Sequence, residues 1–205
     1  MPHLSMLRSY TWADLLTIGN AACGTLAILL CLESLAEQNP ACLWYAMGLL
    51  PLALALDVAD GYVARLDRRR QSRLGADLDS LADVISFGVA PAVIGYALGL
   101  RGGWDIAVLT YFVACGVSRL ARFNVTASAL ADQATGKVKY FEGTPIPTSV
   151  LIVALLAAAT WAGRTGPDLW LGAVRLGPAW LHPLVLVYAA SGSAMISATL
   201  RIPKP

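Results

Sequence analysis

The stretch DVADGYVARLDRRRQSRLGADLDSLAD, residues 57–83, decides the fold of this chain. Asp57 and Asp60 end one apolar run, and Asp79 and Asp83 begin the next. Side chains three or four positions apart share one face of a helix. Because a short basic link joins the two runs, the two helices are predicted to run antiparallel. All four carboxylates would then lie at one depth.

Apolar residues dominate on both sides of this stretch. Of the 205 residues, 57% are hydrophobic and 14% are charged, whereas a soluble domain has about 25% charged residues. A helix needs about 20 apolar residues to cross the bilayer core. The sequence therefore predicts an all-α membrane protein, a single domain over residues 1–205 that forms a six-transmembrane-helix bundle. The six segments are 12–35, 41–66, 76–99, 104–124, 146–163 and 178–200.

The basic residues predict the orientation of this bundle in the cell membrane. With six spans and both termini cytoplasmic, twelve of the fifteen Lys and Arg residues lie at the cytoplasmic face, and Arg101, Arg164 and Arg175 lie outside. This bias follows the positive-inside rule, and it places the aspartate layer just inside the cytoplasmic face. Before the first span, residues 4–10 form either a short interfacial helix or a flexible tail.

Cysteine and histidine chemistry is not indicated. The four cysteines lie in apolar segments without a CxxC pair, as expected of small buried hydrophobic residues. His3 and His182 fall on opposite sides of the predicted membrane, so they cannot share a catalytic site. No nucleic-acid partner is expected.

Four carboxylates in one membrane layer need cations. A single Asp at the centre of a membrane helix costs about 2.5–3.5 kcal/mol on translocon scales, and mutual repulsion adds to that cost. Ligands that are all oxygen suit Mg²⁺, Mn²⁺ or Ca²⁺ rather than zinc. We therefore interpret the layer as a divalent-metal site, formed by Asp57, Asp60, Asp79 and Asp83. Asp67 and Asp77 are predicted instead to form salt bridges with the basic link.

The whole pattern, D-x2-D-G-x2-A-R-x9-G-x3-D-x3-D, resembles the signature of the CDP-alcohol phosphotransferases. Four further segments, LLTIGNAACG, DVISFGVAPA, SRLARFNV and FEGTPIPTS, resemble one branch, the integral membrane CDP-diacylglycerol–serine O-phosphatidyltransferases. These segments extend from about residue 15 to about residue 150. The rest of the chain adds only apolar helix.

The resemblance implies a role for each residue of the pattern. Three aspartates would bind metal, and Asp83 would contact the metal site and act as general base. The CDP site would be lined by Gly61, Ala64, Arg65 and Gly75, with Asp60 and Asp79 close by. The resemblance also implies Mg²⁺ or Mn²⁺ as cofactor, with two ions, CDP-diacylglycerol and L-serine as substrates, and a homodimer. Diacylglycerol and an archaeal ether lipid remain open.

Polar residues outside the pattern allow two interpretations each. Thr17 and Asn20 either contact the nucleotide or form hydrogen bonds between helices. Arg119 and Arg122 share one face of the fourth helix, where they bind an acceptor carboxylate or simply anchor the cytoplasmic end. Glu142 either holds the acceptor ammonium or is a solvated loop charge.

Two other functions compete with serine transfer. The same chemistry with glycerol 3-phosphate or inositol phosphate as acceptor needs additional cationic residues, and the branch-like segments argue against it. A divalent-cation transporter belongs to a different class and needs polar residues across the whole membrane. Here the acidic residues stop at one face and the outer halves of the helices are apolar, which favours an enzyme.

Overall fold

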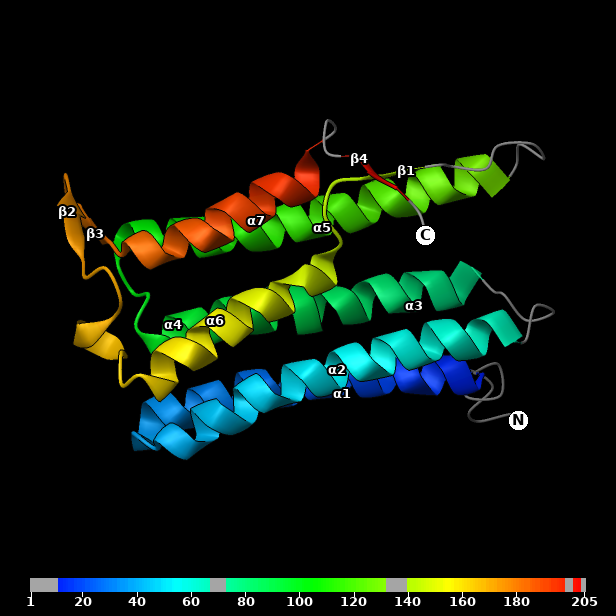
Figure 1. Ribbon diagram of the computed structural model, residues 1–205. Coiled ribbons are helices and arrows are strands. Elements are labelled where there is room, and N and C mark those ends of the chain that lie inside the picture. The colour runs from blue at the N-terminus through cyan, green and yellow to red at the C-terminus, as the bar shows by residue number, and fades with distance from the viewer. Residues whose placement is uncertain (1–10, 67–72, 132–139, 198–200, 204–205) are drawn as a thin grey trace, which may run out of the picture.

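The computed structural model describes residues 11–66, 73–131, 140–197 and 201–203. Helices lie side by side along one direction and form an elongated bundle (Figure 1). Their bounds are α1 Trp12–Glu37, α2 Pro40–Leu66, α3 Arg73–Asp83, α4 Ala90–Leu98, α5 Gly103–Ala131, α6 Ser149–Trp161 and α7 Leu186–Ile196. The start of α1 and the short strand β4 lie at the same end of the bundle (Figure 1).

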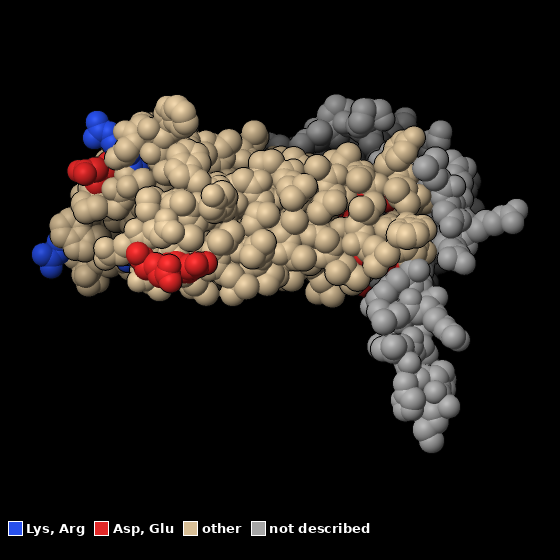
Figure 2. Space-filling view, turned by 90° about the horizontal axis from the view of Figure 1, so that it is seen from below, with Lys and Arg blue, Asp and Glu red and all other residues tan. Residues whose placement is uncertain are grey.

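The helical membrane character is confirmed. Four helices are long and apolar enough to cross a membrane: Trp12–Glu37, Pro40–Ala64, Gly75–Leu98 and Gly103–Val125. Two shorter apolar helices follow, Ile146–Trp161 and Pro183–Ile196. Figure 2 shows a long lateral face made almost entirely of uncharged residues, as a lipid-facing surface requires. The six full-length spans and the cytoplasmic termini remain predictions, and the proposed helix over residues 4–10 lies outside the described residues.

The sixth predicted segment begins too early. Residues predicted as helix from 178 onward form β3, Ala179–Leu181, which pairs antiparallel with β2, Val174–Leu176. Gly177 has a φ of +62°, a left-handed conformation that permits the tight turn between these strands. The helix begins only after this hairpin, with the 3-10 turn η6, Pro183–Val185. Apolar composition alone does not distinguish such a strand from a helix.

A buried carboxylate fixes the hairpin end of the bundle. Asp105, fully buried near the start of α5, accepts hydrogen bonds from the backbone N–H groups of Gly102 at 2.7 Å and His182 at 2.8 Å. The Nδ1 atom of His182 lies 2.6 Å from Asp105 Oδ2. These contacts join α5 to the segment between β3 and α7. His182 and Asp105 therefore have a structural role. They lie at the end of the bundle away from the aspartate pattern.

The third predicted span is one continuous helical segment with a π-helical insert. The insert, η3, covers Val84–Val89 and joins α3 directly to α4. It begins one residue after Asp83, and π turns are frequent at functional sites. Ser86 on this insert donates a 2.8 Å hydrogen bond to the backbone carbonyl of Asn20 on α1. The insert thus fixes how α1 lies against the aspartates.

Gly24 allows this close contact between α1 and η3. A Cβ added at Gly24 would lie 2.7 Å from the Cα atom of Ser86, closer than real side chains approach backbone. Gly48, on α2, has open space around the same position. The two glycines are both helical, so they form a matched pair for testing the contact.

Gly24→Ala should destabilise the folded protein by about 1–3 kcal/mol, the usual cost of overpacking a well-packed contact. Gly48→Ala should be neutral or slightly stabilising, because alanine favours helix over glycine. Thermal unfolding of both variants in detergent checks this. An equal melting temperature for the two variants would contradict the close contact.

Candidate metal and substrate site

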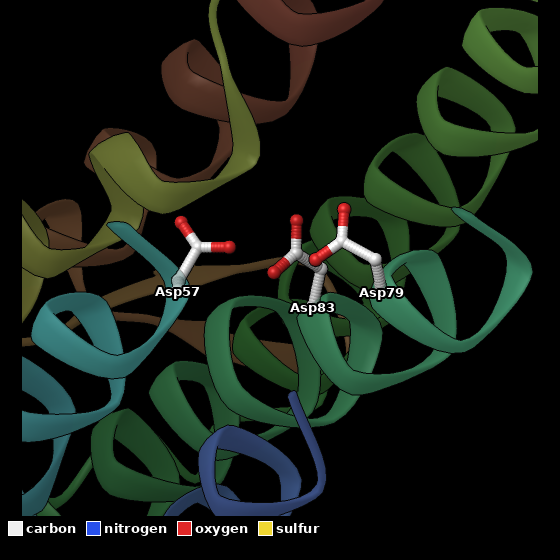
Figure 3. A group of neighbouring side chains, drawn as sticks. All are labelled: Asp57, Asp79 and Asp83. Carbon is white, nitrogen blue, oxygen red and sulfur yellow. The ribbon is translucent and has the colours of Figure 1, made fainter. Parts of the chain in front are cut away.

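Three of the four pattern aspartates converge. Asp57 projects from α2, and Asp79 and Asp83 project from α3, with their carboxylates pointing into one space (Figure 3). One oxygen from each lies within 4.8 Å of the oxygens of the other two. Asp83 is buried, whereas Asp57 and Asp79 are half-buried. We call these three residues the acidic triad.

The fourth aspartate is joined to α1 instead. Asp60 is buried, and its Oδ2 atom accepts a 2.7 Å hydrogen bond from the hydroxyl of Thr17. One turn further along α1, Asn20 Nδ2 lies 3.5 Å from Asp83 Oδ1. Thr17 and Asn20 therefore contact site carboxylates on other helices, as expected of the interpretation in which they form hydrogen bonds between helices. The Oδ1 atom of Asn20 is buried without a hydrogen-bond partner among the described residues.

The triad fits a divalent cation. All its donor atoms are carboxylate oxygens, which Mg²⁺ and Mn²⁺ prefer. Asp79 Oδ1 is buried and has no hydrogen-bond partner in the described part of the chain. Among the side chains that the structure describes, the one ion pair is that of Asp105 and His182, so no described arginine or lysine neutralises the triad at salt-bridge distance. Such an arrangement favours the binding of a cation among the three carboxylates.

The two predicted acceptor arginines differ in their surroundings. Arg119 is half-buried, its Nε atom is buried without a partner in the described structure, and it is close enough to Asp83 for electrostatic attraction. Arg122 is exposed. Two hydrogen bonds between Ser80 and Asn124, of 3.2 and 3.0 Å, hold α3 against α5 beside the triad. Arg119 is therefore the arginine that the fold places toward the site.

The other pattern residues take their expected helices. Gly61 and Ala64 are half-buried and follow Asp60 on α2, and Gly75 precedes the triad members on α3. The side chains of Arg65 and Glu142 lie outside the described residues, as does most of the basic link. The sequence interpretation passed over Ser86, a lone hydroxyl in an apolar run.

Comparisons with known proteins identify the family of the chain. The model of the CDP-alcohol phosphatidyltransferase family matches residues 10–190. The chain is similar to CDP-diacylglycerol–serine O-phosphatidyltransferase of Saccharomyces cerevisiae, with 42% identity over 99% of the chain and 74% of the relative. It is also similar to archaetidylserine synthase of Methanothermobacter thermautotrophicus, with 40% identity over 69% of the chain and 55% of the relative.

A third relative is CDP-diacylglycerol–serine O-phosphatidyltransferase of Mycobacterium leprae. It is 46% identical over 55% of the chain and 37% of its own length. The chain therefore spans about half of the archaeal relative and about a third of the mycobacterial one.

The triad geometry predicts that divalent metal raises the melting temperature through the triad carboxylates and not through exposed ones. Adding Mg²⁺ or Mn²⁺ to chelated protein should raise the melting temperature, because binding stabilises the folded state. Asp79→Asn should abolish most of this rise. Asp77→Asn, an exposed position two residues away on the same helix, should retain it. Differential scanning fluorimetry in detergent measures both, and an unchanged rise in Asp79→Asn would exclude the triad as the metal site.

Proposed function

The chain belongs to the CDP-alcohol phosphatidyltransferase family, and from this premise we propose that it transfers a phosphatidyl group from CDP-diacylglycerol to the hydroxyl of L-serine. The products are phosphatidylserine and CMP. The observation that carries the proposal is the acidic triad, Asp57, Asp79 and Asp83, in a chain similar to serine transferases. The names of the three relatives share serine but differ in the lipid, so these relatives indicate the acceptor and not the lipid tails.

We place this chemistry at the cytoplasmic face of a multi-pass membrane protein. The positive-inside rule supports that orientation. Most Lys and Arg residues lie near the ends of the predicted spans where the aspartates also lie. The two shorter apolar helices complete a six-span bundle in this arrangement. The whole chain then acts as one membrane domain, and it works as a homodimer.

The acidic triad and Asp60 form the metal site in this proposal. These four carboxylates would hold a pair of divalent ions, Mg²⁺ or Mn²⁺, which would supply positive charge to offset that of the pyrophosphate and the departing CMP. Thr17 holds Asp60 by its 2.7 Å hydrogen bond, so this carboxylate keeps one orientation. The nucleotide itself lies along α1, α2 and α3, against Asn20, Gly61, Ala64, Arg65 and Gly75.

Asp83 acts as general base in this proposal. The serine oxygen forms a bond to the lipid-linked phosphorus, the bond between that phosphorus and the CMP oxygen breaks, and the hydroxyl proton passes to Asp83. A serine hydroxyl is a weak nucleophile at neutral pH, so a positioned base is needed during attack. Asn20 Nδ2, 3.5 Å from Asp83 Oδ1, can orient that carboxylate, and direct displacement requires no covalent enzyme intermediate.

The acceptor carboxylate pairs with Arg119 in this proposal. This arginine is half-buried with an unpartnered Nε atom and is attracted electrostatically by Asp83, which favours it over the exposed Arg122 as the partner. Glu142, the second residue of the segment FEGTPIPTS, is the candidate partner of the serine ammonium. One guanidinium matches the single negative charge of the serine carboxylate, whereas the dianionic phosphate of glycerol 3-phosphate demands more.

Asp83→Asn should lower turnover by about 10²–10⁴-fold, as the loss of a general base typically does. Binding of CDP-diacylglycerol should change little, because Asp57, Asp60 and Asp79 keep their charges. Radiometric turnover and lipid-induced thermal stabilisation, measured on the same preparation, separate the two effects. Wild-type turnover in the variant would remove Asp83 from the role of base.

Purified protein with CDP-diacylglycerol and Mn²⁺ should convert labelled serine, and not labelled glycerol 3-phosphate or inositol phosphate, into lipid. Chelation with EDTA should stop the reaction.

Arg119→Ala should raise the KM for serine by about ten- to a hundredfold, the value of a charge-assisted hydrogen bond, and more than Arg122→Ala does. Arg175→Ala, on exposed strand β2, is the control and should leave KM unchanged. Lipid product from glycerol 3-phosphate alone would refute the proposed acceptor.

A further inference from the structure

The connection between α6 and α7 exposes several large apolar side chains. Leu171, Val174, Leu176 and Trp180 have exposed fractions of 74%, 48%, 47% and 51%. They lie close together in sequence, in the turn before β2 and in the hairpin of β2 and β3. Figure 1 places this hairpin at the end of the bundle away from α3, which carries two members of the acidic triad. A gathering of exposed apolar side chains marks a contact with a protein or a membrane.

Leu171 takes a backbone conformation that leucine rarely adopts. Its φ is +70°, and a 3.0 Å hydrogen bond from the Gly172 backbone N–H to the Leu169 carbonyl closes the turn around it. The left-handed region strains a residue that has a Cβ, and glycine or asparagine usually occupies it. Leu169, two residues earlier, is buried and anchors the turn. An outlier of this kind points to a use of the side chain, and a leucine side chain gains free energy by leaving water for an apolar partner.

Contacts with α5 fix the depth of the hairpin. The indole Nε1 of Trp104 donates a 2.9 Å hydrogen bond to the carbonyl of Leu176, and a Cβ at Gly103 would lie 2.9 Å from the Cβ of Ala179. Gly103 is also the first residue of the stretch of α5 that is long and apolar enough to cross a membrane. The hairpin is therefore held at the boundary between this span and water.

Tryptophans gather at the same boundary. Five of the six in the chain belong to segments at this end of the bundle: Trp44 near the start of α2, Trp104, Trp161 at the end of α6, Trp170 and Trp180. The ring centroids of Trp44 and Trp161 lie 6.4 Å apart. Tryptophan is enriched where a membrane meets water, because its ring is amphipathic. The uncharged lateral face of the bundle continues to this end, where charged side chains gather (Figure 2).

Trp180 points away from the protein. Its neighbours on β3, Ala179 and Leu181, are half-buried against the bundle, and successive side chains of a strand point to opposite faces. Arg175 is the cross-strand partner of Trp180, so an exposed guanidinium and the indole share the outer face of the hairpin. An amphipathic ring beside a cation fits the headgroup level of a bilayer rather than its hydrocarbon core.

We propose that the turn and the hairpin, residues 169–181, form an interfacial anchor that rests in the phospholipid headgroup layer at the end of the bundle opposite the acidic triad. Leu171 enters the upper acyl region, and Trp180 lies among the glycerol and phosphate groups. The anchor shares its depth with the tryptophans and continues the lipid-facing surface of the helices, so one bilayer covers both. This inference does not depend on the proposed function. A second copy of the chain is the rival occupant.

A spin label tests the depth of Leu171 and separates the two occupants. Leu171→Cys and a control, Asp168→Cys at an exposed acidic position of the same connection, carry a nitroxide in the full-length protein in phospholipid nanodiscs. The native cysteines are buried or half-buried, so wild-type protein treated alike gives the background. Collisions with oxygen, which concentrates in lipid, should exceed those with a water-soluble nickel chelate at position 171, and the order should reverse at 168. More nickel than oxygen collisions at 171 would overturn the anchor, and so would few collisions with both, which assign the turn to a second copy.

Tryptophan fluorescence keeps the inference testable if the label disturbs the turn. Trp180→Phe keeps an aromatic ring, so the difference between the wild-type and variant spectra isolates the emission of Trp180. Phospholipids brominated near the glycerol should quench this emission more strongly than phospholipids brominated near the end of the acyl chain. Equal quenching by the two lipids, or quenching by neither, would overturn the placement of Trp180 in the headgroup layer.

Discussion

The repulsion among carboxylates at one end of the bundle is the constraint on which the other contacts depend. Asp57, Asp79 and Asp83 bring oxygens within 4.8 Å of one another, with Asp83 buried and the other two half-buried. Like charges at that spacing in a low-dielectric environment repel strongly. Two conditions favour such a cluster: the surrounding helices are fixed, and a cation is supplied. The rest of the fold provides the first condition and the proposed chemistry provides the second.

The helices around the triad are fixed by a small number of polar contacts. Thr17 bonds to Asp60, Ser86 bonds to the Asn20 backbone, and Ser80 bonds to Asn124. Each contact joins two different helices, and each includes a hydroxyl. Because lipid offers apolar helices no hydrophobic reason to associate, close packing and interhelical hydrogen bonds carry much of the specificity. Part of the site geometry therefore depends on three hydroxyl side chains, Thr17, Ser80 and Ser86, to which the proposed mechanism gives no chemical step.

Sequence reasoning succeeded where spacing alone determines position. The i to i+3 and i to i+4 spacings of the aspartates predicted shared helix faces, and the triad confirms this for Asp79 and Asp83 with Asp57 opposite. The different partner of Asp60 could not be read from spacing, because it depends on how α1 packs. Likewise, Arg119 and Arg122 looked equivalent until burial separated them. The hairpin before α7 was missed because its apolar residues carry the same composition as a membrane helix.

The π-helical insert Val84–Val89 has a consequence for how related chains are compared. A π turn is an α-helix that has gained one residue, so it changes the angular phase of everything beyond it by about 100°. The aspartate end and the apolar end of this long helix are therefore out of register with a single α-helical wheel. Because the π turn absorbs the extra residue, a relative lacking one residue in this interval could continue as plain α-helix and, after a one-residue gap, present the same face to lipid. Alignments that run through this helix without a gap should be read as matching the phase change as well as the letters.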